Sequence, residues 1–153
     1  MTDGSKHTSL LKAEPYFVWI VAPQLDTDDP NLKYYYDFDA NIKEFAKAFD
    51  ELGLPWKWQY VTINDYKTII DKIADSANGH IPLVFNLCDG DEVNGAPGLS
   101  VIQYLEERQL IYTGSRERYY HLTTSKITMK QAFDDAGVAN SSWKAITSPS
   151  EDV

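Results

Sequence analysis

Hydroxyl residues and a lysine stand together at the expected start of a helix late in the sequence. Thr123–Ser125 are typical helix-capping residues, and they place Lys126 in or near the first turn of a helix that runs to about Ala136. A lysine there opposes the positive end of the helix dipole unless an anion binds at the same end. Lys126 is therefore a candidate anion contact, with Lys130 one turn further on. The alternative, which position alone favours, is that both lysines lie on the solvated edge of an amphipathic helix.

A second set of polar side chains lies in the acidic segment 23–38. It contains Gln24 and Asp26, further aspartates, and three consecutive tyrosines, Tyr34–Tyr36. Carboxylates in this segment could hold an amino group or a metal, and the tyrosines could form the wall of a pocket. The alternative is a solvated turn whose aromatic residues pack on the next helix, and the sequence favours it because Asp and Pro are ordinary turn residues.

A Gly-rich segment, residues 88–98, carries three acids and three glycines. It is not a calcium loop, because the fifth and twelfth positions counted from Asp89 hold Val93 and Ser100, where an EF-hand needs an oxygen ligand and an acid. Neither a G-x-G-x-x-G nor a Walker A motif is present. We therefore interpret the segment as a connection whose backbone can approach a ligand closely. Its candidate substrate-facing residues are Asp89, Asn94 and Gly95.

Nucleophilic and metal chemistry have little support in the sequence. There is no G-x-S-x-G motif, and the three histidines show no close ligand spacing. The single cysteine, Cys88, follows an apolar run, and a lone thiol in that position is usually buried and inert. We predict no catalytic residue and no metal ligand within this chain.

The elements that must position these residues follow an α/β pattern. Apolar runs of strand length alternate with segments of helical period, in the order βαβαβαβα, which indicates a Rossmann-like, mainly parallel sheet with helices on both faces. The expected strands are Tyr16–Ala22, Trp56–Thr62, Pro82–Leu87 and Leu110–Thr113, with the start of another at Asn140–Ile146. The expected helices are Ala40–Leu52 between Asp39 and Gly53 as caps, Asn64 or Asp65 to Asn78, Leu99–Arg108, and Thr124–Ala136.

Three long loops should share one edge of this sheet. Ligands of open parallel sheets bind beyond the carboxyl ends of the strands, and residues 23–38, 88–98 and 114–123 all follow a strand. Long loops in small domains are often functional. All the candidate residues named above lie in these loops or just after them.

Size and charge limit the classes of function. The chain has 153 residues, 43% of them apolar, which suits one domain, and its formal net charge is −9. An excess of acid argues against nucleic acid or an anionic membrane as the partner. The longest apolar run, Phe17–Ala22, is far too short to span a membrane, and residues 1–14 form a polar tail rather than a signal peptide. A single cysteine suits a reducing compartment, so we expect a cytoplasmic protein.

The motifs between Leu83 and Trp143 occur in a distinctive order over roughly 60 residues. They are Val84-Phe85-Asn86-Leu87, the Gly-rich loop with Asn94-Gly95 and Gly98, Tyr104-Leu105-Glu106, Ile111-Tyr112-Thr113-Gly114-Ser115, Ser125-Lys126 with Lys130, Ala136-Gly137-Val138 and Trp143. In this order and spacing they resemble the D-alanine–D-alanine ligase family of ATP-grasp enzymes.

The resemblance implies that residues 15–143 form the N-terminal preATP-grasp domain of such an enzyme, and that 144–153 begin the linker or the next domain, which is truncated here. These enzymes use ATP and Mg²⁺ to convert a carboxylate to an acylphosphate, which an amine attacks to form an amide. Lys126 matches the family lysine that contacts the nucleotide phosphates. The implied partners are an amino acid or peptide substrate and the missing C-terminal ATP-grasp domains, with a homodimer left open. We expect this chain alone to be catalytically incomplete.

The sequence departs from the family pattern at substrate-facing positions. The first loop lacks the family's Ser-x-Glu, Cys88-Asp89 replaces His-Gly, and Val93-Asn94-Gly95 replaces Glu-Asp-Gly. A relative that joins other amino acids or peptides, or a domain that has lost catalysis, fits these changes. The alternative function is a stand-alone, non-catalytic α/β module that binds a small amino compound or a partner protein. An exposed apolar patch around Trp143 would favour the ligase domain, since a following domain would cover it.

Overall fold

The first apolar run of the sequence forms the central strand of the sheet. In the computed structural model this strand is β1 (Tyr16–Pro23), and it pairs in parallel with β2 (Trp56–Val61) on one side and with β3 (Ile81–Asn86) on the other. The short strand β4 (Ile111–Tyr112) pairs in parallel with β3. The sheet order is β2-β1-β3-β4, which confirms the predicted parallel α/β architecture. The structure describes residues 16–76, 79–90 and 92–146.

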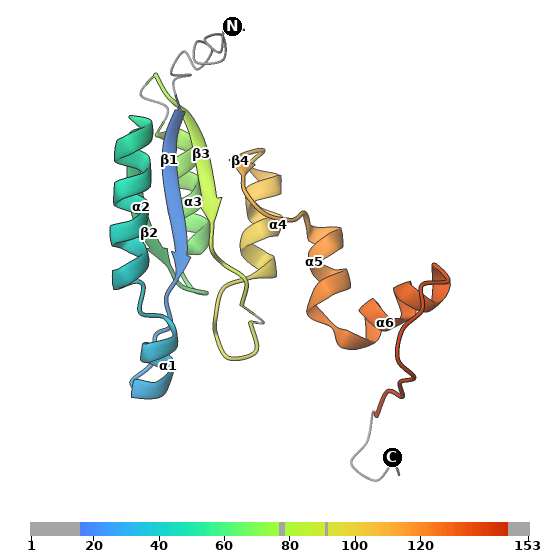
Figure 1. Ribbon diagram of the computed structural model, residues 1–153. Coiled ribbons are helices and arrows are strands. Elements are labelled where there is room, and N and C mark those ends of the chain that lie inside the picture. The colour runs from blue at the N-terminus through green and yellow to red at the C-terminus, as the bar shows by residue number, and fades with distance from the viewer. Residues whose placement is uncertain (1–15, 77–78, 91, 147–153) are drawn as a thin grey trace, which may run out of the picture. The chain divides into compact units, whose positions relative to one another are not determined.

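Helices cover both faces of this sheet (Figure 1). Side chains alternate along β1, so that Val18 and Ile20 pack with Phe49 of α2 (Asp39–Leu52) on one face. On the opposite face Val21 packs with α3 (Tyr66–Asp75) and α4 (Leu99–Glu107). Because both faces are buried, β1 reads as a continuous apolar run rather than an alternating one.

The ends of α2 show which capping predictions hold. Gly53 ends the helix as predicted, with φ +64° and its N–H donated to the carbonyls of Asp50 and Phe49. The prediction that Asp39 caps the start is wrong, because the N-cap residue is Phe38 and no side chain caps it. Instead the Asp39 N–H donates to Oδ1 of Asp37 at 3.0 Å.

The start of α3 also has no side-chain cap. Asp65 occupies the predicted N-cap position, but its carboxylate accepts the Thr62 N–H at 2.7 Å rather than an N–H of the helix. The helix ends at Asp75 with Ser76 as C-cap, earlier than predicted. The predicted end at Asn78 lies outside the described residues.

Two short helices occupy segments that the sequence predicted as loops. In α1 (Pro30–Tyr35) the first residue is a proline and the preceding Asp29 accepts the Asn31 N–H at 2.8 Å, which is a typical N-terminal cap. The second is α5 (Glu117–Thr124). The loop predictions for these stretches of 23–38 and 114–123 are therefore wrong. A local cap starts α1 inside a polar connection, whereas α5 begins after its N-cap residue Arg116 with no side-chain cap.

The last helix, α6 (Lys126–Asp135), begins where the sequence predicted. Ser125 is its N-cap and accepts the Thr128 N–H at 3.5 Å. Thr123 and Thr124 are not caps, because their hydroxyls donate to carbonyls one turn back in α5.

The strand predicted at Asn140–Ile146 is absent from the described residues, which continue as irregular chain. This segment is held to α6 by side-chain hydrogen bonds and not by backbone pairing with a strand. Asp134 accepts the Asn140 amide N–H at 2.7 Å and the Trp143 indole N–H at 2.9 Å.

The chain divides into two units, Met1–Gly114 and Ser115–Val153. The sheet and the helices that cover it belong to the first unit, and α5 and α6 belong to the second. The predicted tail 1–14 lies outside the described residues, and so do residues 147–153 of the predicted linker. Within the part of the chain that the structure describes, no helix is both long enough and apolar enough to cross a membrane.

Candidate functional site

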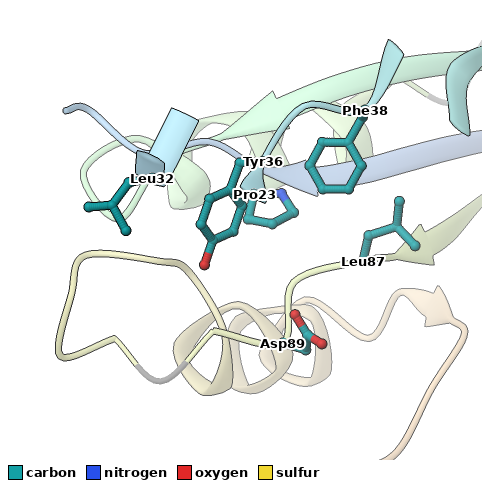
Figure 2. Close-up of a pocket in the computed structure, with 6 residues that line it drawn as sticks. All are labelled: Pro23, Leu32, Tyr36, Phe38, Leu87 and Asp89. Atoms are coloured by element: carbon teal, nitrogen blue, oxygen red, sulfur yellow. The ribbon is translucent and has the colours of Figure 1, made fainter. Parts of the chain in front are cut away.

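The strand order reverses at the carboxyl ends of β1 and β3. The chain passes from β1 through α2 to β2 on one side, and then through α3 to β3 on the other side of β1. In open parallel sheets this switch point leaves a crevice in which ligands bind. A pocket of about 530 Å³ lies there (Figure 2). Its lining residues are Pro23, Leu32, Tyr36, Phe38, Leu87 and Asp89.

One wall of the pocket comes from the end of β1 and the segment around α1. Pro23 is the last residue of β1 and is buried. Figure 2 shows the Tyr36 ring beside Pro23, with its hydroxyl pointing toward the side of the pocket where Asp89 lies. Phe38 packs against Trp58 and Tyr60, with ring centroids 5.5 and 6.4 Å away. This aromatic packing on the face of β2 holds the wall in place.

The opposite wall comes from the turn that follows β3. The Leu87 N–H donates to the carbonyl of Val21 at 2.9 Å, so the end of β3 stays attached to β1. The Asn86 side chain accepts the Cys88 N–H at 3.1 Å, which is a typical Asx turn. These two bonds fix the direction in which the chain leaves β3 and bring Asp89 to the pocket.

The thiol next to this turn is not a nucleophile. Cys88 is 2% exposed, and burial raises the pKa of its thiol well above its ordinary value, with a smaller contribution from the charge of Asp89. A protonated, buried thiol does not attack a substrate. The burial expected for Cys88 is confirmed.

Gly90 and Gly98 bring the two ends of the Gly-rich loop together. The backbones of Gly90 and Gly98 meet in a bridge, and the Gly90 N–H donates to the carbonyl of Pro97 at 3.0 Å. A Cβ at Gly98 would collide with the backbone of Gly90, and one at Gly90 would collide with the backbone of Ala96. Glycine is required at both positions because two backbones approach closely.

The carboxylate of Glu92 caps α4 from inside this loop. Its Oε1 accepts the Gly98 N–H at 3.2 Å and the Ser100 N–H at 2.6 Å. Glu92 has φ +63°, and its N–H donates to the carbonyl of Ala96. The positive end of the α4 dipole thus already holds an anion, and it is not available to a phosphate. The sequence does not reveal this role, because the eight-residue separation of Glu92 and Ser100 fits no capping motif.

The polar groups of the pocket favour a cationic ligand. Asp89 is exposed, and its carboxylate makes no hydrogen bond or ion pair with another described residue. The Tyr36 hydroxyl is the other side-chain polar group of the lining, and the remaining walls are apolar. Residues 1–114 carry 18 acids against 9 lysines and arginines, so the field around the pocket is negative. A small molecule with one ammonium group and an apolar body fits this lining.

Of the five residues predicted to face a substrate, Asp89 alone lines this pocket. Gln24 and Asp26 are exposed on the segment after β1, and the Gln24 N–H donates to the carbonyl of Val61. Asn94 and Gly95 lie at the outer turn of the Gly-rich loop, where Gly95 has φ +79°. Of the three tyrosines, Tyr36 lines the pocket, which agrees with the interpretation that the sequence favoured less.

The two lysines of α6 have different surroundings. Lys126 is exposed in the first turn of α6, and its side chain makes no hydrogen bond or ion pair with the other described residues. The ammonium group of Lys130 instead donates to Oδ1 of Asn140 at 3.1 Å and to Oγ of Ser141 at 2.8 Å. Lys126 is thus the lysine of this helix that is available to a bound anion.

Neither a metal-binding cluster nor a similarity to known proteins helps to define the chemistry of this site. Within 16–76, 79–90 and 92–146, no group of three His, Cys, Asp or Glu side chains could hold a metal ion. No family model matches the chain, and neither the curated proteins nor the solved structures contain a significant match.

Proposed function

We propose that this chain is the N-terminal, substrate-side domain of an ATP-dependent carboxylate–amine ligase that resembles D-alanine–D-alanine ligase. The pocket at the switch point holds the ammonium group of an amino acid or peptide, with Asp89 as its counter-ion. Lys126 contributes one contact to the nucleotide phosphates. The chain is not catalytically complete, and the ATP-grasp domains of the enzyme supply the remainder of the active site.

The observation that carries this proposal is the lining of the switch-point pocket. An uncompensated carboxylate and a tyrosine hydroxyl face an otherwise apolar cavity of about 530 Å³, within the range of small-molecule sites. An amino acid offers an ammonium group for the carboxylate and a short apolar body for the walls. Charge-assisted bonds of this type are about twice as strong as neutral ones.

ATP and Mg²⁺ fit this chain only in part. When bound, ATP would supply the phosphoryl group that activates the carboxylate, and Mg²⁺ would neutralise the phosphate charge. Toward them the described residues offer the ammonium group of Lys126, while the N-terminus of α4 is already capped by Glu92 and no metal-ligand cluster is found among these residues. In our proposal this domain therefore binds and orients the amino substrate, and the other domains bind most of the nucleotide.

The exposed apolar side chains of the second unit support the proposal that another domain follows. None of the described residues 115–146 is buried, although α5 and α6 carry several large apolar side chains. Near Trp143 in the chain, Val138 is 51% and Ile146 is 49% exposed. Exposed apolar side chains of this kind favour a surface that another domain covers.

Calorimetry with ATP tests the nucleotide half of the proposal. We expect weak ATP binding that is lost in Lys126→Ala and kept in Lys43→Ala, since Lys43 is an exposed lysine of α2 in the other unit. Nucleotide binding that is unchanged in Lys126→Ala would show that the assigned role is wrong. Rapid ATP turnover by the purified chain would overturn the claim that the chain is catalytically incomplete.

One observation favours a second candidate, a stand-alone module that binds a small amino compound. Every residue that lines the switch-point pocket belongs to the first unit, so the pocket is formed without any further domain. The same titrations separate the two candidates. Tight binding of an amino compound, with no nucleotide binding under any condition, would favour the stand-alone module.

A further inference from the structure

A second pocket, of about 690 Å³, lies between α5 and α6 within the unit Ser115–Val153. It is separate from the switch-point pocket and shares no residue with it. It is larger than that pocket and its volume is typical of a small-molecule site. Its lining residues are Arg116, Arg118, Tyr119, His121, Leu122, Thr128 and Ala132.

Two guanidinium groups of this pocket have no acidic partner among the described residues. The chain has three arginines, and the one in the first unit, Arg108, is paired with Asp71 at 3.1 Å and with Asp75 at 3.4 Å. The side chains of Arg116 and Arg118 make no hydrogen bond or ion pair with any residue that the structure describes. Two arginines that line one pocket and whose guanidinium groups are unpaired are a candidate anion site, because their planar forks match the oxygens of a carboxylate or phosphate.

The other polar groups of the pocket do not neutralise these charges. The Thr128 hydroxyl lies 3.2 Å from the carbonyls of His121 and Leu122, so it donates its proton to α5 and not to a ligand. His121 lies 3.6 Å from Glu117, which is the one acid within four residues of the two arginines. The described residues 115–146 carry five lysines and arginines against three acids, in a chain whose net charge is −9.

The remaining walls are apolar and accessible. The side chains of Tyr119 and Leu122 are 57% and 37% exposed, and Ala132 of α6 lines the opposite wall. An aromatic ring beside cationic groups suits a ligand that joins a flat or apolar body to a negative group.

We propose that the pocket between α5 and α6 binds a small organic anion, with a terminal carboxylate or phosphate held by Arg116 and Arg118 and an apolar body against Tyr119 and Leu122. This site goes beyond the proposed ligase function, because it requires neither Lys126 nor Asp89. Its failure would therefore leave that function untouched.

The test uses the full chain and four probes of similar size. Phenyl phosphate and benzoate carry the anion, benzyl alcohol has the same apolar body without charge, and benzylamine reverses the charge. Calorimetry and NMR titration should show binding of the two anions alone. We expect Arg116→Gln/Arg118→Gln to weaken that binding about tenfold or more, and higher salt to weaken it in the wild-type chain.

The matched control is Lys43→Gln/Lys47→Gln, which removes the same charge from exposed positions of α2. It should bind the anions as the wild-type chain does. Equal anion binding by the double arginine variant and the wild-type chain, or equal binding of benzyl alcohol and benzoate, would overturn the proposal. Two other results would also overturn the proposal. If phosphate groups bind only when they are presented on vesicles of anionic lipid, the occupant is a membrane. If the chain forms a dimer that the arginine substitutions dissociate, the occupant is a second chain.

Discussion

At the residue scale, Asp89 shows what sequence reasoning can and cannot find in a loop. Asp89, Asn94 and Gly95 come from one Gly-rich segment and were equally good candidates. Asp89 reaches the pocket because the Asn86 side chain and the Leu87 backbone fix the turn just before it. Asn94 and Gly95 lie beyond the bridge between Gly90 and Gly98. That bridge depends on a close approach of two backbones, and no spacing rule in the sequence reveals it.

The thiol of Cys88 should react slowly. Burial raises its pKa and leaves it protonated at neutral pH, so native protein should react with iodoacetamide much more slowly than protein unfolded in urea. Mass spectrometry after timed alkylation measures the two rates. Equal rates would contradict the burial of this side chain.

The carboxyl group of Asp134 makes the second unit sensitive to acid. Bonds from the Trp143 indole and then from the Asn140 amide lower its pKa below the ordinary value of 3.8, with a smaller effect of Lys130. The ionised form is thus favoured by the folded state. Its stabilising contribution is complete above about pH 3.8 and is lost as the pH falls through the lower, folded-state pKa.

The Trp143 indole N–H signal in NMR spectra reports this change between about pH 7 and about pH 2.5. We expect it to move toward the position of an exposed indole only at the acid end, and Asp134→Asn to remove most of that dependence. Asp135→Asn, which changes the neighbouring exposed carboxylate, should leave the titration as it is. An acid transition of the same size in Asp134→Asn would contradict the account.

At the scale of elements, long amphipathic segments were predicted well and short ones were not. The sequence placed β1, α2 and α4 to within one or two residues, because a strand buried on both faces is a continuous apolar run and helices packed on a sheet carry apolar residues at helical spacing. The short helices α1 and α5 carry little buried surface, so no such period marks them. The cap formed by Asp29 and Pro30 was visible in the sequence, but the same residue types also form turns.

The cap of α4 gives a prediction at this scale. Glu92→Ala removes the acceptor of the Gly98 and Ser100 N–H groups, and it should lower the free energy of unfolding by about 1 kcal/mol. Urea denaturation followed by circular dichroism measures the change. The control is Glu107→Ala, an exposed acid at the other end of α4, which should change stability by less than about 0.5 kcal/mol. Equal effects of the two substitutions would show that Glu92 is not a cap.

At the scale of the whole molecule, all of the core found in the described residues lies in the first unit. Its buried apolar residues run from Val18 to Leu105, while none of the described residues of the second unit is buried. The resemblance implied one domain over residues 15–143, and the helical spacing of α6 is compatible with that bound. Spacing alone does not show whether an apolar face has anything to pack against.

A chain of residues 1–114 should therefore fold without the second unit. We expect one cooperative thermal transition with a midpoint within a few degrees of that of the first unit in the full chain. Differential scanning calorimetry of the two proteins makes the comparison. Loss of cooperative unfolding in the shorter chain would show that the second unit contributes to the core.

The central claim is that the switch-point pocket recognises an amine through Asp89. The most direct measurement is calorimetric titration of small amino acids and dipeptides, each paired with its N-acetylated form, into the wild-type chain, Asp89→Asn and the control Asp26→Asn. The account predicts that free amines bind to the wild-type and Asp26→Asn chains, that Asp89→Asn weakens this binding about tenfold or more, and that the acetylated forms do not bind. Equal binding by Asp89→Asn and the wild-type chain, or no binding of any free amine, would contradict it.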